Sequence, residues 1–435
     1  MSREMKDSGI SWIGEIPSDW RIGHLKRLAR IKTGSTPSRS VEEYYSEKSG
    51  LPWIKPGNLN SYDSVENTAE YLTAEGRVAG TVFPQNTVFA CCIASIGKIG
   101  YSNIEASCNQ QINGLIYNDL INWKYGFYSN VAANNEYLAR ANSSVQFILN
   151  STNQGYIQMP IPSIAEQEII STFLDSKCAA IDQVIQKQKD IVNKLMEYKQ
   201  STITQAVTKG LNPSVEMKNT PISGLTQIPK TWNIVPLKTL FSFSKGLSIT
   251  KSDLTDEGIK VISYGQIHSK KCDGVHATNE LIRFTAEKFK SNNSLAKCGS
   301  FIFADTSEDL EGCGNAIYIT NEVYGGYHTV ILNPKETHDY RYLAYLFKTD
   351  AWRTELRKQL TEVKVFSITQ FALKNMHVIL PSYEEMVQIA DFLDSKCLKI
   401  NKSIERSNKI IQKLEEYKKS LIYNAVTGKI DCRNA

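Results

Sequence analysis

Two stretches of the chain place apolar side chains alternately four and three residues apart. The first stretch is residues 164–210 and the second is residues 383–435. Charged and amide side chains fill many of the positions between them, which is the pattern of coiled-coil helices. Proline is absent from both stretches, and glycine first appears at Gly210 and Gly428, where helices commonly end. The pattern therefore predicts two long helices.

The two helical stretches carry almost the same apolar stripe. Residues Phe173 to Cys178 recur unchanged as Phe392 to Cys397. Each stripe must be buried, and its copy in the same chain is a complementary partner, so we expect the helices to pair in an antiparallel arrangement. The alternative is that each helix packs only on its own neighbouring residues. The predicted contact positions are Leu174, Ile181, Ile185, Val192 and Leu195 in the first helix, and Leu393, Ile400, Ile404, Ile411 and Leu414 in the second.

Each helix follows a long irregular stretch, which we call a lobe. Both lobes contain short β-rich runs between Gly, Asn, Ser and Pro turns, and a shorter helical pattern near 123–142 and 340–360. The lobes match each other in sequence only near their ends, where IPSDW returns as IPKTW. We therefore expect an α+β protein with two mixed α/β lobes joined by two long antiparallel coiled-coil helices as an internal repeat. The expected boundaries are 1–163 for the first lobe, 164–210 for its helix, 211–382 for the second lobe and 383–435 for its helix.

Composition narrows the class of protein. Of the 435 residues, 41% are hydrophobic and 22% are charged, which is typical of a soluble globular protein. No apolar run is long enough to span a bilayer, and the N-terminus has no secretory pattern. Nine scattered cysteines fit a reduced cytoplasm better than a disulfide framework. The net charge of +5 permits nucleic-acid binding without establishing it.

The lobe loops are rich in amide, aromatic and basic side chains. Asn and Gln can bond adenine, while Lys can bond guanine or phosphate, although such residues in loops more often cap helices and close turns. Candidate DNA contacts in the first lobe are Lys55, Asn58, Asn60, Lys98, Asn109, Gln110, Gln111, Asn153 and Gln154. Candidates in the second lobe are Tyr264, Gln266, His268, Lys270, Lys271, His328, Thr329, Lys364 and Ser367.

Motifs for catalysis in this chain alone are absent from the sequence. The Gly97-Lys98 pair is followed by Ile99, so it does not complete a nucleotide-binding P-loop. The Asn-Pro dipeptides at 212 and 333 lack the second proline of an amino-methyltransferase motif. We therefore expect no catalytic residues in this chain.

Two groups of side chains have the chemistry of metal ligands. The acidic residues between Asp305 and Glu311 could bind a divalent cation, but they are better explained as a solvated turn. His268, Cys272 and His276 would suit zinc only with a fourth ligand from Cys298 or Cys313. We therefore expect no metal site.

The layout of lobe, long helix, lobe and long helix resembles the specificity subunit of Type I restriction–modification enzymes over essentially the whole chain. The matching segments are Ile16 to Trp20, Pro52 to Gly57, Asn109 to Ile112, Pro162 to Gln167, Phe303 to Asp309, Gly326 to Thr329, Phe366 to Ile368, Ala206 to Thr208 and Ala425 to Gly428. Two segments differ from the sequence that is usual in this family. Glu385-Met386 replaces Glu-Gln, and Cys313-Gly314-Asn315 stands where Gly-Lys is usual.

The resemblance implies two target-recognition domains, each of which reads one half of a split double-stranded DNA sequence, with the helices setting the spacer. It also implies that catalysis belongs to partner chains. Two modification subunits would use S-adenosylmethionine to methylate adenine, and two restriction subunits would use ATP and magnesium to cut DNA. Two alternatives remain open from the sequence: an enzyme acting alone, and a scaffold that bridges protein partners without binding DNA.

Overall fold

The structure is a computed structural model that describes residues 3–59, 62, 64–143, 147–222, 224–362 and 365–434. The chain forms two compact units. One comprises residues 1–190 with 407–435, and the other comprises residues 191–406. Two long helices, α6 (Ile164–Lys209) and α12 (Tyr383–Val426), contribute to both units. The predicted four-part boundaries stay a prediction.

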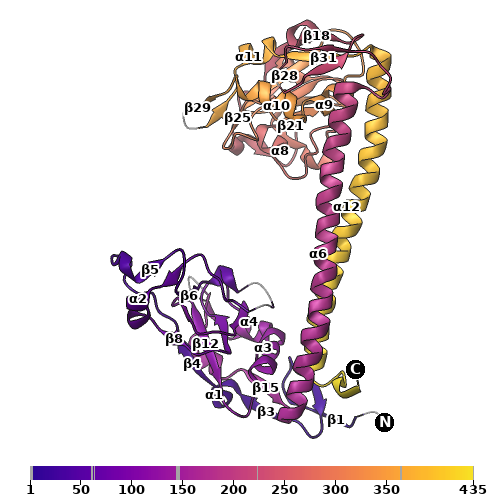
Figure 1. Cartoon of the computed structure of the whole chain (residues 1–435). Coiled ribbons are helices and arrows are strands. Elements are labelled where there is room, and N and C mark those ends of the chain that lie inside the picture. The colour runs from indigo at the N-terminus through magenta and orange to yellow at the C-terminus, as the bar shows by residue number, and fades with distance from the viewer. Residues whose placement is uncertain are drawn as a thin grey trace. The chain divides into compact units, whose positions relative to one another are not determined.

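Two sheets form the framework of the first lobe (Figure 1). The four-stranded sheet has the order β10 (Ile99–Ser102), β9 (Thr87–Cys91), β12 (Ile112–Tyr117) and β4 (Ala29–Thr33). The five-stranded sheet has the order β5 (Tyr45–Ser46), β7 (Tyr71–Leu72), β6 (Leu51–Ile54), β11 (Ala106–Cys108) and β8 (Val82–Phe83). Strands β6 and β11 run parallel, while the other pairs are antiparallel.

The second lobe repeats this topology strand for strand. Its four-stranded sheet has the order β26 (Ala316–Tyr318), β24 (Phe301–Ala304), β28 (Thr329–Pro334) and β19 (Phe241–Lys245). Its five-stranded sheet has the order β20 (Leu254–Thr255), β22 (Arg283–Thr285), β21 (Ile259–Ile262), β27 (Val323–Gly325) and β23 (Leu295–Ala296). The parallel pair is β21 with β27. The two main sheets of each lobe therefore share one topology, although the lobe sequences match only near their ends.

Smaller elements complete each lobe. The first lobe adds β1 (Met5–Asp7), β2 (Glu15–Pro17), β3 (Arg21–His24), α1 (Leu25–Leu28), α2 (Ala74–Ala79), α3 (Trp123–Ala132), α4 (Asn134–Ala139), β13 (Asn142–Ser143), β14 (Phe147–Ile148), α5 (Ser151–Gly155) and β15 (Gln158–Ile161). The second adds β16 (Met217–Asn219), β17 (Gln227–Pro229), β18 (Asn233–Pro236), α7 (Leu237–Leu240), α8 (Tyr264–Ile267), β25 (Thr306–Ser307), α9 (Arg341–Leu346), α10 (Asp350–Arg357), β29 (Thr361–Glu362), β30 (Phe366–Ser367), α11 (Gln370–Asn375) and β31 (His377–Leu380). Each shorter helical pattern thus forms two helices instead of one.

Within each unit α6 and α12 lie side by side and antiparallel, as the apolar stripes predict (Figure 1). In the first unit the Lys418 Nζ donates to Asp182 Oδ2 at 2.5 Å. In the second unit the equivalent Lys199 Nζ donates to Asn401 Oδ1 at 2.9 Å. The predicted contact positions that are buried are Leu174, Ile181, Ile185, Leu393 and Ile400, and those that are half-buried are Val192, Leu195, Ile404, Ile411 and Leu414.

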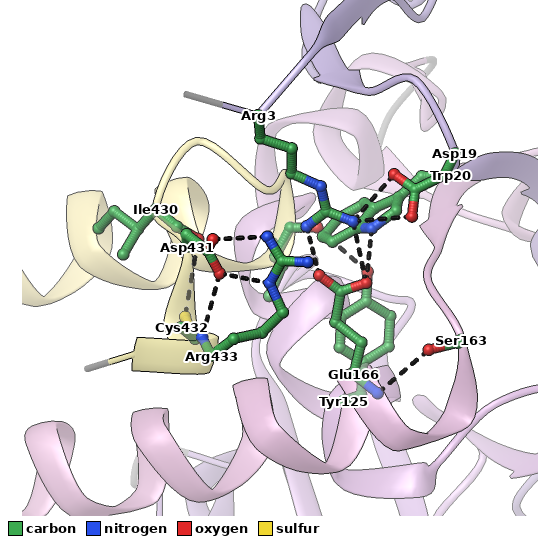
Figure 2. A network of polar contacts seen from close by, with 11 residues as sticks. Arg3, Asp19, Trp20, Tyr125, Ser163, Glu166, Ile430, Asp431, Cys432 and Arg433 are labelled. Carbon is green, nitrogen blue, oxygen red and sulfur yellow. Dashed lines mark hydrogen bonds and ion pairs between the residues drawn. The ribbon is translucent and has the colours of Figure 1, made fainter. Parts of the chain in front are cut away.

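A buried glutamate anchors the start of α6 (Figure 2). The Trp20 Nε1 donates to Glu166 Oε2 at 2.9 Å, and Arg3 binds both Glu166 and Asp19. At the start of α12, Trp232 Nε1 donates in the same way to Glu385 Oε2 at 2.9 Å. Both helices therefore fasten their first turn to the tryptophan of the repeated IPSDW/IPKTW segment.

The residue after each anchoring glutamate differs between the halves. Gln167 donates to the carbonyl oxygens of Leu120 and Pro162, whereas Met386 is completely buried in the apolar core. The replacement of Gln by Met therefore exchanges hydrogen bonds for apolar packing and leaves α12 beginning at Tyr383.

The second long helix is shorter than the 383–435 segment assigned to it. Helix α12 ends at Val426, and Gly428 follows with a left-handed φ of +74°. A Cβ at Gly428 would lie 2.4 Å from Pro17 Cδ, so only glycine allows this close approach. Beyond it, Lys429 Nζ donates to the Ile13 carbonyl at 2.9 Å and holds the chain against the first lobe.

None of the nine cysteines forms a disulfide, and all nine lie within the described residues. Seven are buried and Cys272 is half-buried, so that Cys298 is the one exposed thiol. Among the helices that the structure describes, none is long and apolar enough to cross a bilayer.

Candidate nucleic-acid interface

The parallel strand pair brings two loops of each lobe to one edge. In the first lobe Ile54 of β6 pairs with Cys108 of β11, so the loops that follow these strands begin side by side. Backbone bonding joins them, because Asn109 N donates to the Ile54 carbonyl at 3.1 Å. In the second lobe Gly326 N donates to the Ile262 carbonyl at 2.8 Å. Loops that carry polar side chains therefore meet at an equivalent edge of both lobes.

The loop that follows β6 in the first lobe has the same backbone hydrogen bonding as the loop that follows β21 in the second. Asn58 Oδ1 accepts a hydrogen bond from Lys55 N at 2.9 Å, and Gln266 Oε1 accepts one from Ser263 N at 3.0 Å. In each case the amide side chain caps a short helical turn that contains an exposed glycine, Gly57 or Gly265. The remaining loop side chains are therefore held on a common frame.

The second loop carries different side chains at equivalent positions. Strand pairing aligns Ile112 with Thr329, so Gln110 and Gln111 correspond to Tyr327 and His328. Gln110 Oε1 accepts a hydrogen bond from Thr36, and Gln111 Oε1 accepts one from Asn109 Nδ2 at 3.1 Å. In the second lobe an aromatic group replaces these amides, with the Tyr264 ring centroid 5.3 Å from that of His328.

His328 occupies an unusual backbone conformation beside a buried carboxylate. Its φ is +55°, and its Nδ1 lies 3.8 Å from Asp305 Oδ1. Within the described residues that oxygen is buried without a hydrogen-bond partner, and burial raises the pKa of the Asp305 carboxyl. Left-handed backbone at a non-glycine residue costs about 1–3 kcal/mol and tends to occur where function requires a particular side-chain direction. His328 therefore presents its imidazole at this edge at an energetic cost.

Two cations in the first lobe, Arg39 and Lys55, share one carboxylate. Glu70 accepts hydrogen bonds from both Arg39 and Lys55, and these bonds lower the pKa of Glu70 to about 2. The Arg39 guanidinium also lies 4.6 Å from the Trp53 ring centroid. Lys55 is thus held by a carboxylate while its side chain stays 40% exposed.

A two-stranded ribbon borders the interface in the first lobe. Strands β13 and β14 pair, and Ile148 also bridges to Ile93 in the loop after β9. Phe147 and Ile148 are 55% and 44% exposed. In the second lobe β30 pairs with β25 at the equivalent place, with Ser367 opposite Thr306. Both lobes therefore extend the same edge with a ribbon of apolar and hydroxyl side chains.

Several predicted DNA contacts are buried. Gln154 is completely buried, where its Oε1 accepts a hydrogen bond from Asn113 at 2.6 Å, and Thr329 is 3% exposed and donates to the Gly326 carbonyl. Both side chains are occupied by internal hydrogen bonds, and direct DNA contact by either of them stays a prediction. Asn109 is similarly 9% exposed and acts by holding Gln111.

The other predicted contacts that the structure describes are half-buried or exposed. Asn153 bonds the Arg140 carbonyl, and Lys271 pairs with Glu280 at 3.0 Å, so both have local partners. The His268 ring nitrogens contact the Thr306 carbonyl and Asn315. Lys270 is exposed, and Lys98 is half-buried. Asn60 and Lys364 lie outside the described residues. DNA contact by these residues stays a prediction.

The acidic and histidine groups considered as metal ligands have other partners. Asp309 accepts from Gly312 N at 2.5 Å, Glu311 pairs with Arg357, and His276 contacts Asp273 and Asp394. In the described part of the chain no three His, Cys, Asp or Glu side chains gather as a metal site would require.

Sequence similarity identifies the family. The model of the Type I restriction modification DNA specificity domain matches residues 17–203 and again residues 229–416. The chain belongs to this family. Each match begins at the repeated IPSDW/IPKTW segment and ends within a long helix, so the specificity domain coincides with the repeating unit seen in the structure.

Individual members of the specificity family resemble the chain over nearly its full length. The Type I restriction enzyme MjaVIII specificity subunit of Methanocaldococcus jannaschii is 23% identical over 96% of this chain and 95% of that protein. The EcoBI specificity subunit of Escherichia coli is 22% identical over 95% and 88%. A structure solved in work on complex assembly and conformational transition of the type I R-M system shares the fold. Its TM-score is 0.71 at 14% identity, covering 95% of this chain and 99% of that one.

Sequence reasoning missed several polar residues of the interface. Thr36 binds Gln110, and Arg353 donates to the Cys313 carbonyl at 3.0 Å and to Asn315. Arg353 lies on the strongly amphipathic helix α10, where a charged residue usually indicates a solvated face. Only tertiary contacts between residues distant in sequence distinguish it from its neighbours.

Proposed function

We propose that this chain is the sequence-reading subunit of a Type I restriction–modification complex, in which each lobe binds one half of a bipartite double-stranded DNA target. The observation that supports this most strongly is that equivalent loops of the two lobes have the same backbone arrangement but carry different side chains. Lys55, Gln110 and Gln111 stand where the second lobe carries Ser263, Tyr327 and His328. Amides favour adenine and imidazole donors favour guanine acceptors, so equivalent loops would read unlike sequences.

The paired helices would set the spacer between the two half-targets and bind the partner subunits. Apolar side chains on their exposed faces support the second role. Val184, Ile191, Met196, Tyr198, Leu398 and Tyr417 are each between 43% and 57% exposed. Exposed apolar groups that recur along a helix are a feature of protein-binding surfaces. Two modification subunits and two restriction subunits are the expected partners.

Catalysis in this proposal belongs to those partners. The modification subunits would carry S-adenosylmethionine and methylate adenine, and the restriction subunits would use ATP and magnesium to cleave DNA. A base must leave the helical stack to be methylated, so the role of this chain is to place a modification subunit over a chosen adenine.

The test is co-expression with a Type I modification subunit, followed by mapping of N6-methyladenine in the host DNA. We expect methylation at one motif made of two short specific halves and an unspecified spacer. Methylation by the chain expressed alone would indicate an independent enzyme. Partner binding without any methylated motif, or without DNA binding, would favour a protein-bridging scaffold and contradict the proposal.

A further inference from the structure

Each lobe contains a small cavity at the same place in its topology. The first is about 250 Å³ and lies between the loop after β6, the loop before β10, and helices α3 and α4. The second is about 190 Å³ and lies between the loop that contains α8, the loop before β26, and helices α9 and α10. Ile99 and Ala316 line the two cavities at equivalent strand positions, opposite Ala90 and Phe303.

Both cavities are lined by cations, but different elements supply them. In the first lobe the cation is Lys98, directly before Ile99. The equivalent position in the second lobe is Asn315, a neutral amide. There the cations come from the opposite wall of the cavity, where Lys348 and Arg353 belong to the α9–α10 segment. Each cavity therefore has at least one cation in its wall, and the two lobes supply it from different elements.

The cations of the second cavity have neutral hydrogen-bond partners. Arg353 donates to the Cys313 carbonyl and to the Asn315 side chain, and Lys348 donates to the Asp273 carbonyl. Burial lowers the pKa of both Lys348 and Arg353, which means that their surroundings disfavour the charge. Lys348 and Arg353 are half-buried, and cations in such surroundings without a hydrogen-bonded anion are costly unless a ligand supplies the negative charge.

The nearby carboxylates are engaged elsewhere. Asp273 also lines the cavity, but its Oδ1 accepts the Val275 and His276 amides and its Oδ2 faces the His276 ring. Glu311 pairs with Arg357, which lies one helical turn beyond Arg353. The cavity therefore keeps an excess of positive charge.

The second cavity adjoins the proposed DNA-reading loops. Asn315 Nδ2 lies 3.4 Å from the His268 ring, whose centroid lies 5.8 Å from that of Tyr264. In the first lobe Lys98 closes the loop in which Ala94 takes a left-handed φ of +61° and bonds the Phe147 carbonyl. Each cavity is thus at the border of the loops that would read bases.

We propose that each cavity binds one backbone phosphate of the DNA, through Arg353 and Lys348 in the second lobe and through Lys98 in the first. The inference rests on the proposed DNA-binding function. Phosphate contacts fix the position of a reader on the duplex without reading sequence, and an arginine can bind a phosphate through two parallel hydrogen bonds. Two equivalent cradles would hold both lobes in the same orientation on their half-targets.

The test measures binding of the full chain to a fluorescein-labelled 40-base-pair duplex of arbitrary sequence at about 50 to 200 mM KCl. Loss of one phosphate contact should lower the slope of log affinity against log salt by about 0.9, so that salt weakens the variant about three- to four-fold less than the wild type. We expect this for Arg353→Gln and, independently, for Lys98→Gln. Arg357→Gln is the matched control, because it removes a half-buried arginine of the same helix that pairs with Glu311 and does not line the cavity, and its slope should be unchanged.

A double variant that moves the positive charge to another residue makes the test independent of folding defects. Arg353→Gln combined with Asn315→Lys places the cation where the first lobe carries it, and should restore the wild-type slope. Wild-type slopes in both Arg353→Gln and Lys98→Gln would contradict phosphate binding in the two cavities without contradicting DNA binding by the chain. Absence of DNA binding by the wild-type chain would instead contradict the proposed function itself.

Discussion

The backbone conformation of His328 indicates whether its side chain stabilises the fold or serves the proposed DNA interface. Its backbone is strained at φ +55°, and its imidazole faces the buried Asp305 carboxylate. A residue retained for stability would avoid this conformation, because glycine adopts it without cost. The strain is therefore best explained by a requirement for the imidazole itself at the proposed interface.

Replacement of His328 by glycine should separate stability from reading. We expect His328→Gly to keep or slightly raise the free energy of unfolding, by up to about 1 kcal/mol, because the strain is relieved. The methylated motif should nevertheless change in one half only. Ala94→Gly is the control, since Ala94 has a similar φ of +61° in the other lobe but no polar side chain. An unchanged motif in His328→Gly would exclude His328 as a reader.

His276 fastens α12 to the second lobe and should make this contact sensitive to pH. Its ring nitrogens lie 3.6 Å from Asp273 and 3.5 Å from Asp394, and the hydrogen bonds to Asp273 and Asp394 raise the pKa of His276 to about 9. Arg341 also binds Asp394, and the positive charge of Lys348 lies near Asp273, so these carboxylates face other cations besides the imidazolium.

Because the folded pKa is above the ordinary value of about 6.5, the protonated histidine stabilises the folded state. This contribution is complete below pH of about 6.5 and is lost as the pH rises through about 9. The pair is partly exposed, so we expect a loss of about 1 kcal/mol. Urea unfolding at several pH values, compared between wild type and His276→Asn, measures it. Equal pH profiles for the two proteins would contradict the assignment.

At the scale of single elements, the two ends of the helix pair differ by one charge. Lys418 is 4% exposed, binds Asp182 and lies 3.4 Å from the Tyr62 ring centroid. Its equivalent Lys199 is half-buried and binds the neutral Asn401. Equivalent lysines of the helix pair thus form an ion pair in one unit and a hydrogen bond to a neutral amide in the other.

Exchange of these acceptors should have opposite effects. Asp182→Asn leaves a buried lysine without its carboxylate and should cost about 2–3 kcal/mol. Asn401→Asp gives Lys199 a carboxylate in a more exposed position and should be neutral or stabilising by less than about 1 kcal/mol. Hydrogen exchange of amides near residues 182 and 401 would report each unit separately. Similar effects of both substitutions would show that the acceptor's charge does not matter.

The helices were predictable from the sequence because their information is local and repeated. A period of four and three residues predicts a helix, and identical stripes such as Leu174 to Ile185 and Leu393 to Ile404 predict their pairing. The shared topology of the lobes was not predictable. It depends on pairing between distant residues, such as Val82 with Ser107, and many different side chains satisfy that pairing.

The site was predictable only in part, for a related reason. Loop composition indicated which segments carry polar side chains, but it could not show that Gln154 turns inward to Asn113, 41 positions away. It also could not show that Arg353 bonds Asn315, because those residues meet only through tertiary packing.

At the scale of the whole molecule, the helices can be lengthened without changing either lobe. Seven residues inserted after Lys189 and seven after Asn408 preserve the coiled-coil phase and add about 10 Å to each helix. If the helices set the spacer, the methylated motif should keep both halves while the spacer grows by about three base pairs. Mapping of N6-methyladenine measures this change.

The control is the same insertion in the first helix alone. It moves Asp182 out of line with Lys418 and should weaken helix pairing and abolish methylation. A spacer of unchanged length after the double insertion would show that the helices do not set it. A change in either half-motif would show that helix and lobe are not independent.

The distribution of thiols offers a practical route to these measurements. Because eight of the nine cysteines are buried or half-buried, a maleimide dye should attach to Cys298 alone under brief labelling. The fluorophore would then report from the second lobe without the removal of any native cysteine. A second dye on a synthetic duplex would convert DNA engagement by that lobe into an energy-transfer signal.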